Sequence, residues 1–253
     1  MPLTAQQMRV RAALADGLSV ANGASGVAGV MLLLMWRDPR ALLAACACVF
    51  VAWGFDSVDG LAARGVVRSP SEGAILDSLC DTNSFGALPA ALLAAYGARR
   101  FAADPALAAV CAAAGIAYFS CAVLRLRRYT VGAVSHDAEE RTSFKGVPSP
   151  VAAMSVSAAL LAALTSSPLL TWLPVVFALA AAPLMLSRVP YTDTPHLAKW
   201  MWRVKWPLPL LAAFAYVVGN PAVALAVFFA AYFASGAIGR RSQPSTNARL
   251  GAS

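Results

Sequence analysis

Three properties of the sequence predict an all-α, polytopic membrane protein. Of its 253 residues, 59% are hydrophobic and only 13% are charged, whereas soluble domains average about half and one-quarter. Apolar runs approaching the ~20 residues that cross a bilayer recur along the chain. Because lipid offers the backbone no water, such runs fold as helices that satisfy their own N–H and C=O groups. We expect a transmembrane helical bundle of about eight spans, preceded by a short N-terminal interfacial helix.

The expected segments follow one another with short connections. Residues 1–17 carry charges and lack an apolar core, which favours a cytoplasmic or interfacial helix over a secretory signal. Residues 18–239 form one membrane domain, and residues 240–253, rich in Ser, Asn, Arg and Gly, are expected to be a disordered cytoplasmic tail. The fifth, seventh and eighth spans are the shortest. The eight expected spans are Leu18–Trp36, Ala41–Ala62, Ala74–Tyr96, Ala106–Leu124, Val151–Leu164, Leu169–Leu186, Leu208–Val218 and Pro221–Phe233.

The distribution of Lys and Arg predicts the orientation, because cytoplasmic connections carry an excess of these residues. With the N-terminus inside, sixteen of the 20 basic residues fall in cytoplasmic segments. This asymmetry favours two cytoplasmic termini in an inner, cytoplasmic membrane. The four basic residues expected on the outside are Arg37, Arg40, Arg99 and Arg100.

The net charge of +8 does not indicate nucleic-acid binding, because the basic residues lie at span ends beside an anionic leaflet. The five cysteines form no CxxC pair and have no histidine at metal-ligand spacing. We expect them to be free thiols that pack as small hydrophobic side chains. They are Cys46, Cys48, Cys80, Cys111 and Cys121.

Four aspartates stand out at the cytoplasmic ends of the second and third expected spans. Asp56 and Asp59 are three residues apart, and Asp77 and Asp81 are four apart, so each pair lies on one helix face. The connection Gly65–Glu72 is short, which predicts antiparallel neighbouring helices with both pairs at one depth. Charges at such positions are costly and need a specific partner.

A divalent cation would neutralise these four carboxylates. Oxygen-only ligands favour Mg²⁺ or Mn²⁺ over zinc, and two ions are expected. The alternative is structural: the acids could form a salt-bridged helix cap with Arg64 and Arg68. A cap would not require both pairs at facing depth.

The aspartate region resembles the signature of the CDP-alcohol phosphotransferase (CDP-alcohol phosphatidyltransferase) family, D-x2-D-G-x2-A-R-x8-G-x3-D-x3-D. Every fixed position of that signature is met. The resemblance implies that the aspartates bind the metals and that Asp81 is also the general base. It further implies that CDP is bound by Asp56, Gly60, Ala63, Arg64 and Gly73.

Three further segments resemble the phosphatidylserine synthase branch of that family. Leu76–Ala90 is similar to LDSLADxxSFGxxPA, Arg125–Thr130 to RLARFN, and Phe144–Pro150 to FxGLPxP. This branch transfers the phosphatidyl group of CDP-diacylglycerol to the hydroxyl of L-serine and releases CMP. The departures from these patterns are Cys80, Arg127, Thr130 and Val147.

Several polar residues near the aspartates are candidates for binding the acceptor. Arginine can bind a carboxylate through two hydrogen bonds, although basic residues here also satisfy the positive-inside rule. Ser84 and Asn83 could contact the acceptor or join helices, and the same two roles are open to the buried amide of Asn22. The acceptor-binding candidates are Asn83, Ser84, Arg125, Arg128 and Lys145.

Two alternative functions stay open. The same chemistry could use glycerol 3-phosphate or inositol phosphate as acceptor, for which Arg127 would add a charge near the pocket. An ion-coupled transporter is a remote alternative, because its acids would be expected near the membrane midplane and not at one face. The resemblance also makes a homodimer possible.

Overall fold

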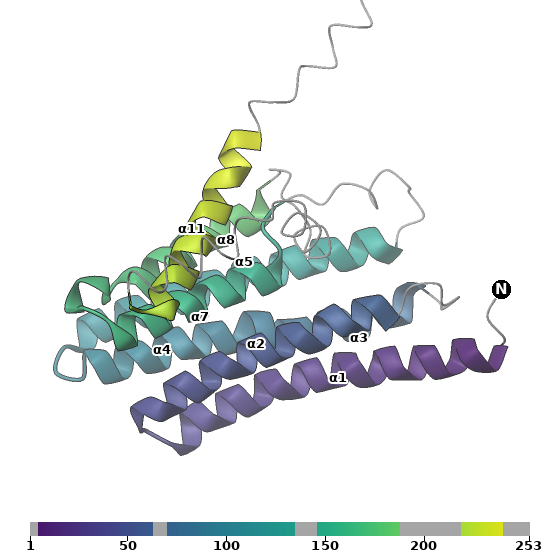
Figure 1. The fold of residues 1–253 in the computed structure, drawn as a ribbon, viewed down its shortest axis with the longest axis horizontal. Helices are drawn as coiled ribbons and strands as arrows, with labels where there is room; N and C mark the ends of the chain where they lie inside the picture. The colour runs from purple at the N-terminus through teal and green to yellow at the C-terminus, as the bar shows by residue number, and fades with distance from the viewer. Residues whose placement is uncertain (1–4, 63–69, 135–145, 188–218, 240–253) are drawn as a thin grey trace, which may run out of the picture.

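The structure, a computed structural model, describes residues 5–62, 70–134, 146–187 and 219–239 (Figure 1). Within these ranges the chain is all-α and contains no strand, as predicted. The helices are α1 (Ala5–Met35), α2 (Pro39–Ala62), α3 (Pro70–Asp81), the π-helix η1 (Thr82–Ala87), α4 (Leu88–Arg100), α5 (Pro105–Val134), α7 (Ser149–Thr165), the 3₁₀ turn η2 (Pro168–Leu170), α8 (Leu173–Leu186) and α11 (Pro221–Gly239).

The expectation of a separate, short N-terminal helix was wrong. Residues 5–17 belong to α1, which continues without a break to Met35. The physical reason is that no proline interrupts this stretch, and Gly17 costs an α-helix only about 1 kcal/mol relative to alanine. The first span therefore extends beyond the bundle at its N-terminal end.

The prediction of about eight spans is not confirmed. The described residues contain four helices long and apolar enough to cross a membrane: Gln6–Met35, Pro39–Gly60, Pro105–Val131 and Pro168–Leu186. The expected third span is divided among α3, η1 and α4, which follow one another directly. The fifth and eighth correspond to shorter apolar helices, and Leu208–Val218 lies outside the described residues, as does the expected tail at 240–253.

Three turns of the described structure lie at one end of the bundle, called here the turn end: those that join α1 to α2, α4 to α5 and α7 to α8 (Figure 1). Arg99 on α4 donates to the carbonyl oxygens of Trp36 (2.9 Å) and Asp38 (3.2 Å) in the α1–α2 turn. Tyr96 donates to the carbonyl of Thr171 in the α7–α8 turn, at 2.9 Å. A positive charge on the free carbonyls after α1 is favourable, because these groups carry the negative end of the helix dipole. The opposite end holds the start of α1, the end of α2 and the start of α3 (Figure 1).

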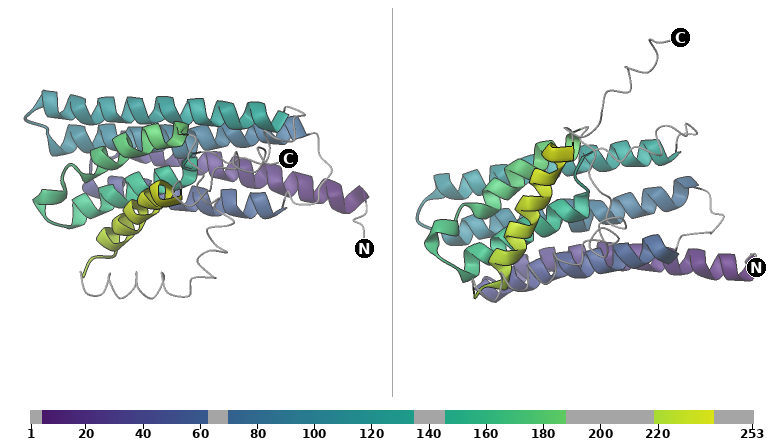
Figure 2. Two further views of the ribbon diagram at one scale, coloured as in Figure 1. Left: turned by 90° about the horizontal axis from the view of Figure 1, so that it is seen from above. Right: turned by 45° about the horizontal axis from the view of Figure 1, so that its top comes forward.

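The core of the bundle surrounds α7, most of whose side chains are buried. This helix packs against α2, α4, α8 and α11, and the two turned views show it among its neighbours (Figure 2). Gly146 directs the chain into α7 with a φ of +90°, and a Cβ there would lie 2.5 Å from the carbonyl oxygen of Met185. Only glycine fits both the dihedral angle and the space.

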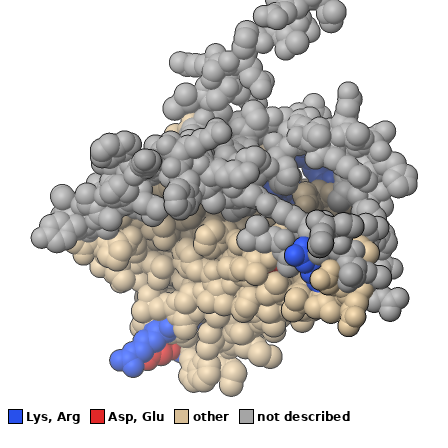
Figure 3. All heavy atoms as spheres, turned by 45° about the vertical axis from the view of Figure 1, so that its right-hand side comes forward, with Lys and Arg blue, Asp and Glu red and all other residues tan. Residues whose placement is uncertain are grey.

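Charged side chains are few on the face shown in Figure 3. Acidic and basic atoms of the described residues lie together at its lower left, further basic atoms lie at its right, and most of the remaining described surface belongs to uncharged residues. Exposed large apolar residues such as Leu34, Ile116 and Leu169 suit contact with lipid chains. All five cysteines are free and buried or half-buried, as predicted.

Candidate active site

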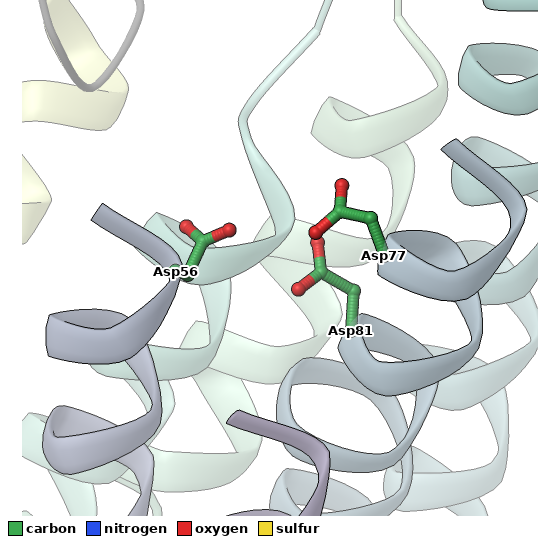
Figure 4. Close-up of side chains that lie close together, drawn as sticks. All are labelled: Asp56, Asp77 and Asp81. Atoms are coloured by element: carbon green, nitrogen blue, oxygen red, sulfur yellow. The ribbon is translucent and has the colours of Figure 1, made fainter. Parts of the chain in front are cut away.

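Three of the four predicted aspartates converge. One oxygen from each of Asp56, Asp77 and Asp81 lies within 4.8 Å of the others. Figure 4 shows Asp56 on α2 facing Asp77 and Asp81, which project from successive turns of α3. Asp81 is buried, and the other two are half-buried. The i, i+4 spacing on α3 therefore places both of its carboxylates opposite α2, as the sequence predicted.

The two aspartate-bearing helices are not close neighbours over their length. Within the described residues α2 and α3 have few backbone contacts with each other, whereas α1 packs against both. The sequence predicted direct neighbours, and the structure corrects this point. Glycines on α1 allow close contact with α3 and η1, and side chains of α1 hydrogen-bond to carboxylates of both α2 and α3, so α1 is called here the floor of the site.

Two polar residues on α1 hold two of the carboxylates. Asn22 Nδ2 donates to Asp81 Oδ1 at 2.8 Å, and Ser19 Oγ donates to Asp59 Oδ2. Asp59 is buried beside Ser19 and is not part of the three-carboxylate cluster. The structure therefore gives Asp59 a hydrogen-bonded position next to the cluster, and its role as a metal ligand stays a prediction.

A π-helix begins directly after Asp81. The N–H of Leu88 donates to the carbonyl of Asn83, five residues back, which widens the turn. Pro89 has no N–H to offer the carbonyl of Phe85, and the buried hydroxyl of Tyr118 on α5 donates to that oxygen instead, at 2.9 Å. This π-helix was not predicted from the sequence, in which Gly86 and Pro89 within an apolar run were the available signal.

The donor set fits a hard divalent cation. The cluster consists of carboxylate oxygens alone, with no histidine or cysteine among its members. Such ligands suit Mg²⁺ or Mn²⁺. Three mutually repelling carboxylates within 4.8 Å also need a positive partner, and the guanidinium of Arg125 on α5 is near enough to interact with Asp56 and Asp81.

Arg125 and Arg128, both acceptor-binding candidates, have different surroundings. Arg125 is half-buried and donates to Ser149 Oγ at the start of α7, at 2.8 Å. Its buried Nε has no hydrogen-bond partner among the described residues. Arg128 is exposed and donates to the carbonyl of Leu186 at the end of α8, at 2.9 Å. Of these two arginines, Arg125 is therefore the one that combines an unpartnered Nε with a guanidinium near enough to interact with Asp56 and Asp81.

The other acceptor candidates have mixed positions. Ser84 is buried and donates to the backbone carbonyl of Asn22 at 2.7 Å, so it joins α1 to η1. Asn83 is exposed on η1. Lys145 lies outside the described residues. Of the two roles open to Asn22, the structure supports joining helices, through its bond to Asp81.

A profile of known families supplies the identification. The CDP-alcohol phosphatidyltransferase profile matches residues 12–180, about two-thirds of the chain. The chain belongs to this family. The match extends from α1 into α8 and contains all four aspartates, as the resemblance of the signature implied.

A curated relative of this CDP-alcohol phosphatidyltransferase is the archaetidylserine synthase of Methanothermobacter thermautotrophicus. The two are 33% identical over 147 residues, which is 57% of this chain and 56% of the relative. The chain therefore aligns with a little over half of that protein's length.

The CDP-binding residues implied by the family signature lie only partly in the described structure. Gly60 is exposed, and a Cβ placed there would meet nothing within 4 Å, so the space above it is open. Gly73 is half-buried on the first turns of α3. Ala63 and Arg64 lie outside the described residues. Their role in binding CDP stays a prediction.

Three residues that contact the site or its supporting helices were not predicted from the sequence: Ser19, Tyr118 and Ser149. Ser19 lies one turn before Asn22 on α1, and this spacing of two polar residues on one face of an apolar helix was the available signal. For Tyr118 and Ser149 there was none, because their partners come from distant parts of the chain.

Proposed function

We propose that this CDP-alcohol phosphatidyltransferase transfers the phosphatidyl group of CDP-diacylglycerol to the hydroxyl of L-serine, giving phosphatidylserine and CMP. The observation that carries the proposal is the convergence of Asp56, Asp77 and Asp81 within 4.8 Å in a chain of this family. The serine-linked activity named for the archaeal relative supports serine as the acceptor.

The reaction is a substitution at the lipid-linked phosphorus. The serine oxygen forms a new bond to this phosphorus, the bond from phosphorus to the oxygen of CMP breaks, and the serine proton passes to Asp81. The carboxylate of Asp81 suits this role because Asn22 holds it on one side and it lies beside the other two acids. Asp56, Asp77 and Asp81, with Asp59 beside them, would hold Mg²⁺ or Mn²⁺, and we propose a pair of ions.

One or two bound cations would offset charge on the diphosphate and on the departing CMP. The residues of the chain provide the rest of the site. Gly60 would leave room for the nucleotide to approach α2. We assign the carboxylate of serine to the guanidinium of Arg125, whose buried Nε has no hydrogen-bond partner among the described residues. Arg128 is already bound to the end of α8, so it is the weaker candidate.

We further propose that the site faces the cytoplasm from the inner membrane. The turn end carries Arg99 and Arg100, two of only four basic residues expected outside. The carboxylates lie away from these turns, toward the end where α2 finishes and α3 begins. Their position near one end, and not at the bundle centre, argues against an ion-coupled transporter. A homodimer is compatible with this arrangement.

An acceptor assay tests the proposal. Purified full-length protein is given labelled CDP-diacylglycerol, Mn²⁺ and one alcohol at a time: L-serine, glycerol 3-phosphate or inositol phosphate. We expect CMP release with serine and formation of labelled phosphatidylserine. Asp81→Asn is the matched inactive control, and its rate should fall on the order of 10² to 10⁴-fold, the usual share of a general base.

Each contrary result has a distinct meaning. Turnover with a phosphorylated alcohol and not with serine would assign the chain to another branch of the family. CMP release that persists without any divalent cation would contradict the role of the carboxylates. Absence of CMP release with every alcohol, from protein that is folded and binds Mn²⁺, would reject the transferase reaction.

A further inference from the structure

The floor of the site is formed by a helix that carries none of the four aspartates. Ser19 and Asn22 on α1 are three residues apart and lie on one face of the helix. Ser19 donates to Asp59 of α2, and Asn22 donates to Asp81 of α3. One helix turn of α1 therefore contacts one carboxylate from each aspartate-bearing helix. Ser19 and Asn22 are called here the α1 clamp.

Glycines allow α1 to approach closely enough for short side chains to reach. A Cβ on Gly23 would lie 3.0 Å from the sulfur of Cys80, and one on Gly26 would lie 2.7 Å from the Cα of Ser84. These positions follow directly after the α1 clamp on the helix. A side chain at Gly23 or Gly26 would push α1 away from α3 and η1. The amide of Asn22 would then be too far from Asp81 to donate its hydrogen bond.

The α1 clamp is itself fixed in place. The backbone carbonyl of Asn22 accepts the hydroxyl of the buried Ser84 at 2.7 Å, and Ser19 Oγ also lies 3.1 Å from the carbonyl of Ala15. Both clamp side chains are buried, with Asn22 at 0% exposure. The orientation of the Asn22 amide is determined by its partner, since the reverse orientation would place two oxygens against each other. The other polar atom of this amide, Asn22 Oδ1, is buried without a hydrogen-bond partner in the described structure.

We propose that Ser19 and Asn22 are positioning residues that fix the carboxylates of Asp59 and Asp81 for cation binding and, at Asp81, for proton transfer. Four acids from two helices that barely touch have no means of holding a common geometry by themselves, because like charges move apart when their rotamers are free. Donors on a third helix remove that freedom. The part concerning proton transfer rests on the proposed function.

The two clamp residues have separable effects. Among the aspartates of the described structure, Ser19 hydrogen-bonds to Asp59 alone. Its loss should therefore weaken the cation site, and excess cation should overcome this defect. Asn22 contacts Asp81, so its loss should weaken cation binding and also slow proton transfer. Excess cation cannot correct the second defect, because the carboxylate of Asp81 would still lack its fixed orientation.

The test measures Mn²⁺ binding to the purified full-length protein by electron paramagnetic resonance, without substrate. Partners that orient metal ligands typically contribute 10–100-fold in metal affinity. We expect Ser19→Ala and Asn22→Ala each to raise the Kd for Mn²⁺ by roughly that factor. Ser19→Thr, which keeps the hydroxyl, should bind within about threefold of the unmodified protein, well under that factor.

Ser25→Ala is the matched control on the same helix. Ser25 Oγ donates to the carbonyl of Cys48 at 3.0 Å, so this variant loses a hydrogen bond between α1 and α2 without touching an aspartate. It should keep the original Mn²⁺ affinity. Thermal unfolding of every variant without metal separates loss of the cation site from loss of the fold.

A second measurement follows CMP release at saturating Mn²⁺. Ser19→Ala should recover most of the original kcat, and Asn22→Ala should not. Unchanged Mn²⁺ affinity in both clamp variants, equal losses in Ser25→Ala, or no Mn²⁺ binding by the unmodified protein would each overturn the proposal. If the binding pattern holds but no alcohol gives turnover, the α1 clamp stands and the proposed function fails.

Discussion

Arg125 and Arg128 lie nearly one turn apart on α5 and carry the same charge, yet the structure uses them differently. Arg125 donates to Ser149 and has a buried Nε without a partner among the described residues, while the exposed Arg128 donates to the carbonyl of Leu186, the last residue of α8. A guanidinium can bind a carboxylate through two parallel hydrogen bonds, which a lysine ammonium cannot reproduce. Arg125 is therefore a candidate binding group, whereas Arg128 caps the end of α8.

Exchange of each arginine for lysine tests this difference. Arg125→Lys should raise the KM for the acceptor by roughly 10-fold or more, because a hydrogen bond to a charged group contributes about 1.5–3 kcal/mol. Arg128→Lys, the control, should change it by less than about threefold, because a surface contact contributes little. Steady-state kinetics with serine varied at fixed CDP-diacylglycerol measures both. Equal effects in the two variants would remove Arg125 from the acceptor site.

Among the helix–helix contacts, the one that fixes α1 beside the carboxylates joins α1 to η1, the segment that follows Asp81. The π-helix η1 places Ser84 against Gly26, and Tyr118 replaces the backbone donor that Pro89 lacks. Extra atoms in such a contact force backbones apart, which usually costs about 1–3 kcal/mol. The packing of α1 and the geometry of the site are therefore linked.

Glycine substitutions on α1 measure that link. Gly26→Ala places a Cβ 2.7 Å from Ser84, so it should lower the free energy of unfolding by about 1–3 kcal/mol and reduce CMP release. Gly17→Ala is the matched control, since a Cβ at Gly17 meets nothing within 4 Å and alanine favours the helix by up to about 1 kcal/mol. Thermal unfolding in detergent reports both changes. A stable, active Gly26→Ala protein would show that α1 can move without disturbing the carboxylates.

For the whole molecule, the arrangement of the helices separates two chemically different ends. The turns with Arg99, Tyr96 and Thr171 lie at one end, and the carboxylates lie toward the other. On the face shown in Figure 3, most of the described surface belongs to uncharged residues. Since α5 runs from one end to the other, its two ends should lie on opposite sides of a membrane.

Cysteine labelling tests this arrangement in cells. Ala103 and Arg127 are both exposed, one just before α5 and the other toward its end, and the native cysteines are buried or half-buried. Ala103→Cys should react with an impermeant maleimide in intact cells, and Arg127→Cys only after the membrane is opened. The unmodified protein should remain unlabelled. Reaction of both variants from the same side would show that α5 does not cross the membrane, and the reversed pattern would invert the proposed orientation.

Composition and spacing along one helix were enough to predict the helical membrane class, the family signature and the pairing of aspartates on helix faces. They did not predict how many segments would be long enough to span a membrane, since α3, η1 and α4 divide one apolar run. The bond from Ser19 to Asp59, the convergence of the three other acids and the place of α1 as the floor became known only from the packing of the helices. The physical reason is that these contacts join residues 40 to 62 positions apart, and no local spacing encodes them.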